Sequence, residues 1–304
     1  KIMRDLHDFA GKIHIDFHYD SGHILHANDR RIESIILSTS SIFYKDVCGG
    51  TLAGVLEHFN NKVIHQVLVK ENRGGSFCYI LEEDRQYEAP SYYVPTMHSV
   101  GVGDVYNSVF ISELFESDME KRMRLAALCA AQYAGTMDYK RFRENVRLVY
   151  TNISELNELA GIRLPWTDRR DINIYLAAPD FPNVDTSLLN RLNECLLYHN
   201  FIPRLPIREN GIASKTMCFE EKLSIYHKDI VLMNESDLLI AVLLYNDPGT
   251  LVELGMFKQT GKPTILFDPF DCCENMFVRH TPDYLCKNIA DVIDSVYLCL
   301  GRSS

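Results

Sequence analysis

The stretch NDPGTLVELGMFKQTGKP, residues 246–263, places two carboxylates around a turn and the start of a helical pattern. Thr250 and Glu253 have the spacing of a capping box, in which the hydroxyl and the carboxylate together close the first turn of a helix. A second interpretation makes Glu253 a nucleophile. A carboxylate can attack the anomeric carbon of a sugar and form a covalent glycosyl-enzyme, which another acceptor then resolves.

Chemistry at an anomeric carbon needs more than one group. A second carboxyl must handle the proton of the departing base, and a tyrosine hydroxyl can orient the nucleophile. Asp229, Asp247 and Tyr175 are candidates for these roles. Each also has an ordinary structural interpretation, since Asp247 is a typical turn residue before Pro-Gly, Asp229 a typical helix charge and Tyr175 a typical core residue. Spacing alone leaves both sets of interpretations open.

The elements that must position these residues follow from the apolar pattern. Strands are predicted at 172–178, 201–205, 237–244 and 263–268, and helices at 185–200, at 219–235, from about Leu251, and at 283–300. The predicted fold class is α/β, with a doubly wound, parallel, five-stranded sheet of the flavodoxin or Rossmann type, of which these four strands are located in the sequence. In such a sheet the site lies at the carboxyl ends of the strands, and Glu253 is expected in the first turn of its helix.

Three segments resemble the nucleoside 2-deoxyribosyltransferase family. They are YLAAPDF (175–181), the run from Tyr226 to Leu244, and DPGTLVELGMFKQTGKP (247–263), whose ELG and GKP are specific. The resemblance implies Glu253 as nucleophile, Tyr175 as its orienting partner, and Asp229 and Asp247 as contacts to the base. It also implies substrate-binding positions at Asp180, Phe181 and Gly249, with Phe181 as an aromatic wall.

In that family a residue from a neighbouring subunit holds the 5′-hydroxyl of the sugar, and Asn275 in CCENMF matches it loosely. The resemblance therefore implies a homo-oligomer. The chain departs from the family at AAPDF, where many members have a glycine, and at Met256 and Phe257, where small residues are common. Some related members hydrolyse nucleotides, so water is an alternative acceptor.

The first half carries a second motif, HSVGVGDVYN (98–107), after predicted strands at 13–17, 33–38, 65–70 and 76–81. Helices are predicted at 104–116 and 120–135. Gly101 and Gly103 can present backbone amides to an anion at a helix start. The motif resembles the DTxGAGD motif of ribokinase-type (PfkB) kinases, which implies Asp104 as the base. His98 replaces the leading Asp of that motif, and only the second half of such a kinase has a counterpart.

These patterns predict a partial ribokinase-like domain at 1–145, a linker at 146–170 and a transferase-like domain at 171–304. Residue 1 is Lys, so the chain is a candidate fragment or processed product. The net charge of −10 argues against nucleic-acid binding. Nine cysteines without metal-site spacing, and no apolar run long enough for a membrane, favour a soluble cytoplasmic protein with reduced thiols.

No cofactor and no metal is expected. His14, His18, His23 and His26 could bind a metal by number, but scattered surface histidines are the favoured interpretation. The predicted function is cleavage or transfer at the N-glycosidic bond of (deoxy)nucleosides or their monophosphates through a glycosyl-Glu253 intermediate. The alternatives are a hydrolase that releases free base, a nucleotide-sensing or scaffold protein, and a sugar or nucleoside kinase if an N-terminal half is missing.

Overall fold

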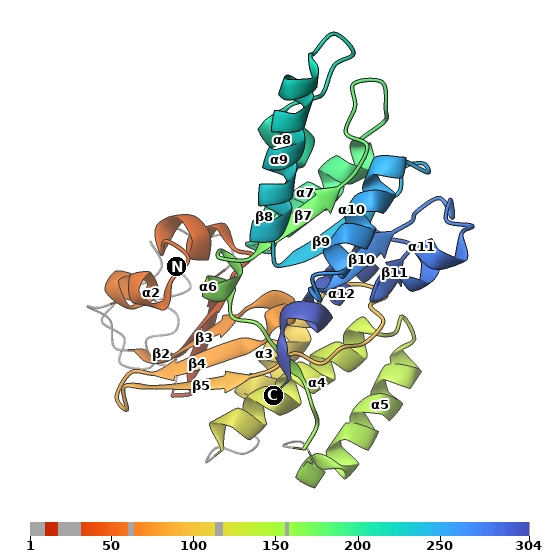
Figure 1. Cartoon of the computed structure of the whole chain (residues 1–304). Coiled ribbons are helices and arrows are strands. Elements are labelled where there is room, and N and C mark those ends of the chain that lie inside the picture. The colour runs from red at the N-terminus through yellow and green to blue at the C-terminus, as the bar shows by residue number, and fades with distance from the viewer. Residues whose placement is uncertain (1–9, 18–31, 60–63, 113–117, 156–157, 304) are drawn as a thin grey trace. The chain divides into compact units, whose positions relative to one another are not determined.

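A computed structural model describes residues 10–17, 32–59, 64–112, 118–155 and 158–303. Of the four histidines considered as a metal site, three lie outside these residues: His18, His23 and His26. The chain divides into two compact units. The first holds the described residues up to Thr167 together with those from Gly301 on, and the second is Asp168–Leu300 (Figure 1).

The first unit is built on a five-stranded sheet with strand order β1-β2-β3-β4-β5. These strands are β1 (Ile13–Phe17), β2 (Ile32–Ser38), β3 (Ile64–Lys70), β4 (Ser76–Ile80) and β5 (Arg85–Ala89). The first three run parallel, and β4 and β5 are antiparallel to their neighbours. The helices of this unit include α2 (Leu52–Phe59), α3 (Val102–Ile111), α4 (Met119–Ala134) and α5 (Tyr139–Thr151). The first four strands and the first turns of α3 and α4 match the predicted segments.

The sheet of the first unit is covered on both faces, because successive strand side chains point to opposite sides. One face of β2 and β3 packs against α3 and α4 through residues such as Tyr106, Phe110 and Met123. The other face packs against Phe43, Val55 and other residues between β2 and β3.

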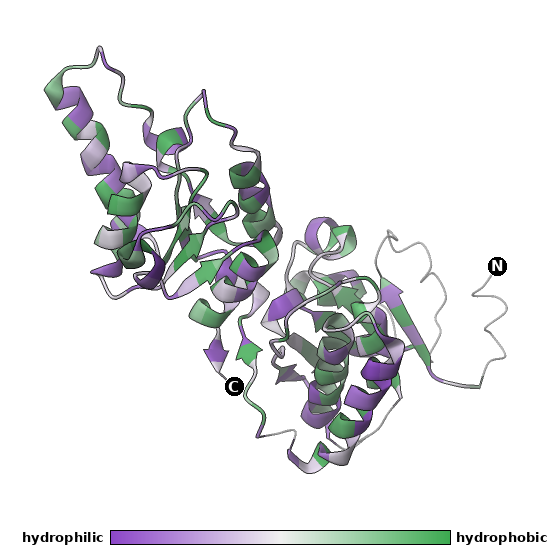
Figure 2. Cartoon of the chain, turned by 90° about the vertical axis from the view of Figure 1, so that its right-hand side faces the viewer, coloured by the Kyte–Doolittle hydropathy of each residue, from purple (hydrophilic) through white to green (hydrophobic). Residues whose placement is uncertain are grey.

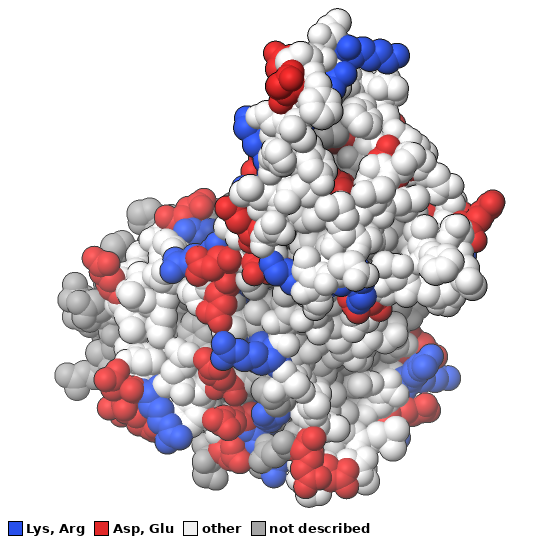
Figure 3. Space-filling model, viewed as in Figure 1, with Lys and Arg blue, Asp and Glu red and all other residues white. Residues whose placement is uncertain are grey.

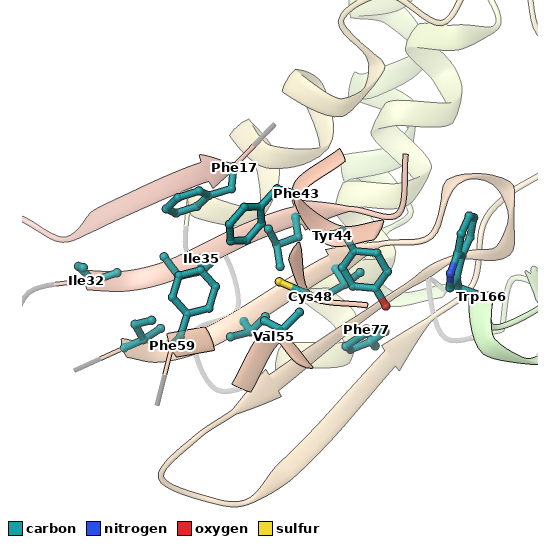
Figure 4. Packing of buried hydrophobic residues seen from close by; sticks show 14 residues of the cluster. Phe17, Ile32, Ile35, Phe43, Tyr44, Cys48, Val55, Phe59, Phe77 and Trp166 are labelled. Carbon is teal, nitrogen blue, oxygen red and sulfur yellow. The ribbon is translucent and has the colours of Figure 1, made fainter. Parts of the chain in front are cut away.

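Aromatic rings dominate this second face, as Figure 4 shows. Phe17 of β1 stacks on Phe43 with ring centroids 5.3 Å apart and meets Phe59 edge-on at 5.7 Å. Such pairs add to the stabilisation from their buried area. Trp166, which lies where the predicted linker was placed, belongs to the same core.

The second unit has a wholly parallel five-stranded sheet with strand order β11-β10-β9-β7-β8. The strands are β7 (Asn173–Ala177), β8 (Ile202–Arg204), β9 (Leu238–Val242), β10 (Thr264–Phe267) and β11 (Tyr284–Cys286). The helices are α6 (Trp166–Arg169), which begins in the first unit, α7 (Ser187–Tyr198), α8 (Pro206–Asn210), α9 (Phe219–Glu235), α10 (Pro248–Lys258), α11 (Met276–His280) and α12 (Ile289–Leu300). The strands are mostly green in Figure 2, whereas the helices around them mix green with purple.

Helices cover both faces of this sheet. Leu232 of α9 and Phe257 of α10 pack with Tyr175, Leu239 and Leu266 on one face. The helices α7 and α12 contact each other and also contact β8 and β10, respectively. The predicted doubly wound parallel sheet is therefore confirmed, and β7 and β9 are buried on both faces as continuous apolar runs require.

Two predicted boundaries are wrong. The final helix, expected at 283–300, begins only at Ile289, because Tyr284–Cys286 forms the edge strand β11. The quoted helix begins at Pro248 instead of near Leu251, since proline is well suited to the first helical position and Asp247 caps it. Residues 113–117 of the expected helix 104–116 lie outside the described residues.

The chain returns to the first unit at its end. The strand β12 (Arg302–Ser303) pairs antiparallel with β6 (Ile162–Arg163). Arg163 is buried and ion-paired with buried Glu71, and its Nη1 also donates to the Gly74 carbonyl at 2.8 Å. The other oxygen of Glu71 accepts from the Trp166 backbone N–H at 2.9 Å. One carboxylate thus joins three segments of the first unit.

Lys and Arg side chains lie interspersed with Asp and Glu over the first unit on the face drawn in Figure 3. Within the described ranges, no helix combines the length and the apolar character that crossing a bilayer requires. All nine cysteines are free thiols.

Replacing Arg163 with alanine should lower the free energy of unfolding by about 3–5 kcal/mol, because the buried Glu71 carboxylate would lose its guanidinium partner. Unfolding in urea can be followed by tryptophan fluorescence. The signal reports on the first unit, because Trp166 is the only tryptophan and belongs to the core of that unit. Arg147→Ala on exposed α5 is the control and should change stability by less than about 0.5 kcal/mol. Equal losses in the two variants would contradict this account.

Candidate active site

A hydrogen bond joins β7 to α10 at the centre of the candidate site. The hydroxyl of Tyr175 donates to Oε1 of Glu253 across 2.7 Å. Tyr175 lies inside β7 and is fully buried, while Glu253 is half-buried. Both side chains lie on the face of the sheet that α9 and α10 cover, so two of the predicted site residues are in direct contact.

Glu253 does not cap its helix. The N-cap of α10 is Asp247, whose Oδ2 accepts from the backbone N–H of Thr250 at 2.8 Å and from its hydroxyl at 3.0 Å. Thr250 is thus the third residue of the helix, and Glu253 is in the second turn. The capping-box interpretation of Thr250 and Glu253 is therefore wrong, and so is the placement of Glu253 in the first turn.

Burial and neighbouring charge change the acidity of this pair. The pKa of Glu253 is raised to about 7, chiefly by desolvation; the hydrogen bond from Tyr175 lowers it, and the charges of Asp229 and Asp247 raise it. The pKa of Tyr175 is raised, first by burial and then by the Glu253 charge. The tyrosine therefore stays protonated and remains a donor.

Asp229 lies on α9 and is half-buried. Its Oδ1 accepts from Nδ2 of Asn210, the last residue of α8, at 2.8 Å. Burial raises the pKa of Asp229, and the Asn210 hydrogen bond partly offsets that rise. Because the charges of Asp229 and Asp247 act on Glu253, the structure brings all four predicted catalytic residues into one neighbourhood.

The loop after β7 carries Asp180 and Phe181. Asp180 accepts two hydrogen bonds from the guanidinium of Arg208 on α8, at 2.5 and 3.2 Å, and Phe181 is half-buried. Gly249 is the second residue of α10, where an added Cβ would lie 3.0 Å from Oδ2 of Asp247. A larger residue at position 249 would therefore crowd the capping carboxylate.

Asn275 is the N-cap of α11 and accepts from the Phe277 backbone N–H at 2.8 Å. Within the described chain, Asn275 makes no hydrogen bond to Glu253. The loop before it is held by Asp268, which is fully buried and accepts from the backbone N–H groups of Cys272 and Cys273 at 2.8 and 3.1 Å. Sequence reasoning missed Asp268, although its place directly after a buried strand is a signal.

Sequence reasoning also missed Asn210 and Arg208. Both belong to the five-residue helix α8, which is too short to show an apolar period. The signal that could have indicated it is Pro206 at a helix start, followed by Gly211 at its end. In the described part of the chain, no group of three or more His, Cys, Asp or Glu side chains could hold a metal ion.

The kinase-like motif forms the start of α3 in the first unit. Gly101 is the N-cap with φ +80°, and Asp104 is exposed in the first turn. An added Cβ at Gly103 would lie 3.4 Å from Nζ of Lys70. That ammonium donates to Oδ1 of Asn107 at 2.8 Å and pairs with Asp16 at 3.2 Å. A lysine thus lies beside the helix start where the motif would hold an anion.

Residues 174–278 match the family model of nucleoside 2-deoxyribosyltransferase. This stretch contains Tyr175, Asp229, Asp247 and Glu253, and the resemblance inferred from their motifs is confirmed for this part of the chain. A nucleoside 2-deoxyribosyltransferase domain supports nucleoside glycosyl transfer as the general class of activity. A comparison with curated proteins finds no match.

Solved structures similar to the chain are of two kinds. One is the 2-deoxyribosyltransferase of Bacillus psychrosaccharolyticus, 24% identical over 40% of this chain and 89% of that chain, with a TM-score of 0.33. The other kind includes the ribokinase of Thermotoga maritima, 18% identical over 50% and 52% of the two chains, with a TM-score of 0.38. A nucleoside kinase of Methanocaldococcus jannaschii is 15% identical over 45% and 48%, with a TM-score of 0.32. The chain spans about half the length of these kinases.

Replacing Glu253 with glutamine should stabilise the fold at neutral and alkaline pH. On folding, the pKa of Glu253 rises from 4.5 to about 7. The contribution of this carboxyl to the free energy of unfolding therefore falls as pH increases through that interval. Glutamine keeps an acceptor for the Tyr175 hydroxyl without the charge. Glu253→Gln is expected to gain about 1–3 kcal/mol over the parent at pH 8 and nothing below pH 4.

Urea unfolding followed by circular dichroism across this pH range measures the difference. Glu194→Gln on the exposed side of α7 removes one negative charge elsewhere in the same unit and serves as the control. A Glu253→Gln variant no more stable than the parent at pH 8 would refute the raised pKa of Glu253.

Proposed function

We propose that the second unit cleaves the N-glycosidic bond of (deoxy)nucleosides or their monophosphates and transfers the sugar through an ester on Glu253. The observation that carries this proposal is the 2.7 Å hydrogen bond between Tyr175 and Glu253. It orients a partly desolvated carboxylate whose pKa is also raised by the charges of Asp229 and Asp247. The match of residues 174–278 to the deoxyribosyltransferase family supports the same class of reaction.

In the first step an oxygen of ionised Glu253 attacks C1′ of the sugar. The C1′–O bond forms as the C1′–N bond breaks, and the bonding electron pair leaves with the base. Protonated Asp229 donates its proton to the base nitrogen, so a neutral base departs and Asp229 becomes a carboxylate. Burial raises the pKa of Asp229, and the reactive state is the one in which Asp229 holds the single proton of the Asp229–Glu253 pair.

In the second step an acceptor attacks C1′ of the glycosyl ester and regenerates the Glu253 carboxylate. The acceptor is a nitrogen of a second base in a transferase, or water in a hydrolase. The acceptor proton passes to Asp229, which restores the starting state. Asp247 is committed to capping α10 through Oδ2, so we assign it a contact to the base and give the proton transfer to Asp229.

Turnover should require the Glu253 carboxylate. The purified full chain is incubated with the four deoxynucleosides or their monophosphates, with and without a second free base, and base release is followed by chromatography. Glu253→Gln should reduce turnover by at least about 10³-fold, since glutamine cannot act as the nucleophile. Glu194→Gln should retain parental turnover.

The acceptor separates the two enzyme classes in this assay. Base release that depends on the second base identifies a transferase, and release without it identifies a hydrolase. In either case, mass spectrometry of acid-quenched parent should find the peptide containing Glu253 heavier by one glycosyl group. No turnover by the parent at any pH would contradict the proposal and favour a sensing or scaffold role.

Tyr175→Phe should move the acidic limb of the pH–rate profile to higher pH. The hydroxyl lowers the pKa of Glu253, so its loss raises that pKa further and leaves less of the ionised nucleophile at neutral pH. We expect kcat at pH 7 to fall by about 10–100-fold, with partial recovery at pH 8–9. An acidic limb at the parental position would show that the tyrosine does not tune Glu253.

A further inference from the structure

Three successive residues of α8 are each fixed to a different element of the second unit. Arg208 holds Asp180 in the loop after β7, at 2.5 and 3.2 Å. Glu209 accepts from Arg204 of β8, at 2.7 Å from Nη2 and 3.1 Å from Nε. Asn210 donates to Asp229 of α9 at 2.8 Å. The short helix α8 is therefore hydrogen-bonded to three segments around the candidate site.

These ties leave Asn210 little freedom. Glu209 also accepts from the backbone N–H of Leu205, which fixes the start of α8, and Pro206 occupies the first position. Gly211 follows with φ +91° and its backbone N–H bonded to the Ile207 carbonyl, which ends the helix directly after Asn210. The backbone position of Asn210 is thus fixed by its neighbours in α8.

The amide defines the orientation of the Asp229 carboxyl. The amide donates to Oδ1, and among the described residues none donates a hydrogen bond to Oδ2. A carboxyl held at one oxygen presents the other in a fixed direction, which proton transfer in the transition state requires. Asn210 also lines an open cavity of about 580 Å³ beside α9, whose lining residues include neither Asp229 nor Glu253.

We propose that Asn210 is the positioning residue of the reaction, which holds Asp229 so that Oδ2 exchanges the proton with the departing and the incoming base. The inference rests on the proposed function and adds a residue to it. Asn210 acts through Asp229 and does not itself touch the reacting atoms.

The charged groups near Asp229 determine how an Asn210 variant should change the pH–rate profile. Glu253 on α10 and Tyr175 on β7 lie close enough for Asp229 to raise the pKa of each. His227 and Lys228, next to it on α9, line the cavity that Asn210 also lines. The Asn210 donor favours the ionised form of Asp229, so its loss raises the energy of the state in which Asp229 and Glu253 are both ionised. The alkaline limb of the pH–rate profile should then move to higher pH.

The test compares Asn210→Leu with Asn210→Gln in the full chain, using the four deoxynucleosides as substrates. Asn210→Leu keeps the side-chain volume without the donor, whereas Asn210→Gln restores a donor on a longer stem. We expect Asn210→Leu to lower kcat by about tenfold and to move the alkaline limb upward. Asn210→Gln should recover part of both, and KM should change less than kcat.

The matched control is Asn288→Leu. Asn288 Nδ2 also donates to an aspartate, Asp291, at 2.8 Å, but it follows the edge strand β11, two strands away from β9. Its loss should leave the pH profile unchanged. If Asn210→Leu fails to fold, Asn210→Ser replaces it with the same expectation of a lower kcat and a shifted limb.

The outcomes separate the two proposals. A parent with turnover whose Asn210 variants keep the parental kcat and alkaline limb overturns this inference and leaves the proposed function standing. A parent without turnover overturns both. A lower kcat with an unshifted limb in every Asn210 variant also overturns the inference, because that result indicates a merely structural residue.

Discussion

The second unit depends on one contact between two groups that are each costly to bury. A fully buried tyrosine hydroxyl needs a partner, and a carboxylate out of water needs a donor. Tyr175 and Glu253 meet both needs with one bond of 2.7 Å. The bond forms because Tyr175 of β7 points to the face of the sheet that α10 covers, so the packing of α10 sets the geometry of the pair.

Three other carboxylates of the candidate site have hydrogen-bond partners of their own. The remaining carboxylates are engaged by neighbours that do not neutralise Glu253 itself: Asp247 by the start of α10, Asp180 by Arg208, and Asp229 by an uncharged amide. A cation beside Glu253 would lower its pKa and stabilise the ion before reaction. Among the described residues no Lys or Arg is ion-paired with Glu253, in agreement with its raised pKa.

The parts of this structure that follow from the sequence are those with strong periodic or motif signals. The buried runs of β7 and β9 predict parallel strands because both faces are covered, and the ELG motif gives the residues that the sheet brings together. The three residues of β11 are too few for a period, and α8 is hidden for the same reason. The Asn210–Asp229 contact spans two elements, and no local pattern in either one indicates it.

The pairing of β12 with β6 makes the first unit discontinuous in sequence. During synthesis, all of Asp168–Leu300 must leave the ribosome before the strand that completes this pairing is available. The second unit can therefore fold while the first is still unfinished, as domains tend to fold as units in the order they emerge. A chain cut at the boundary near Asp168 would leave β6 as an unpaired edge, open to association with other chains.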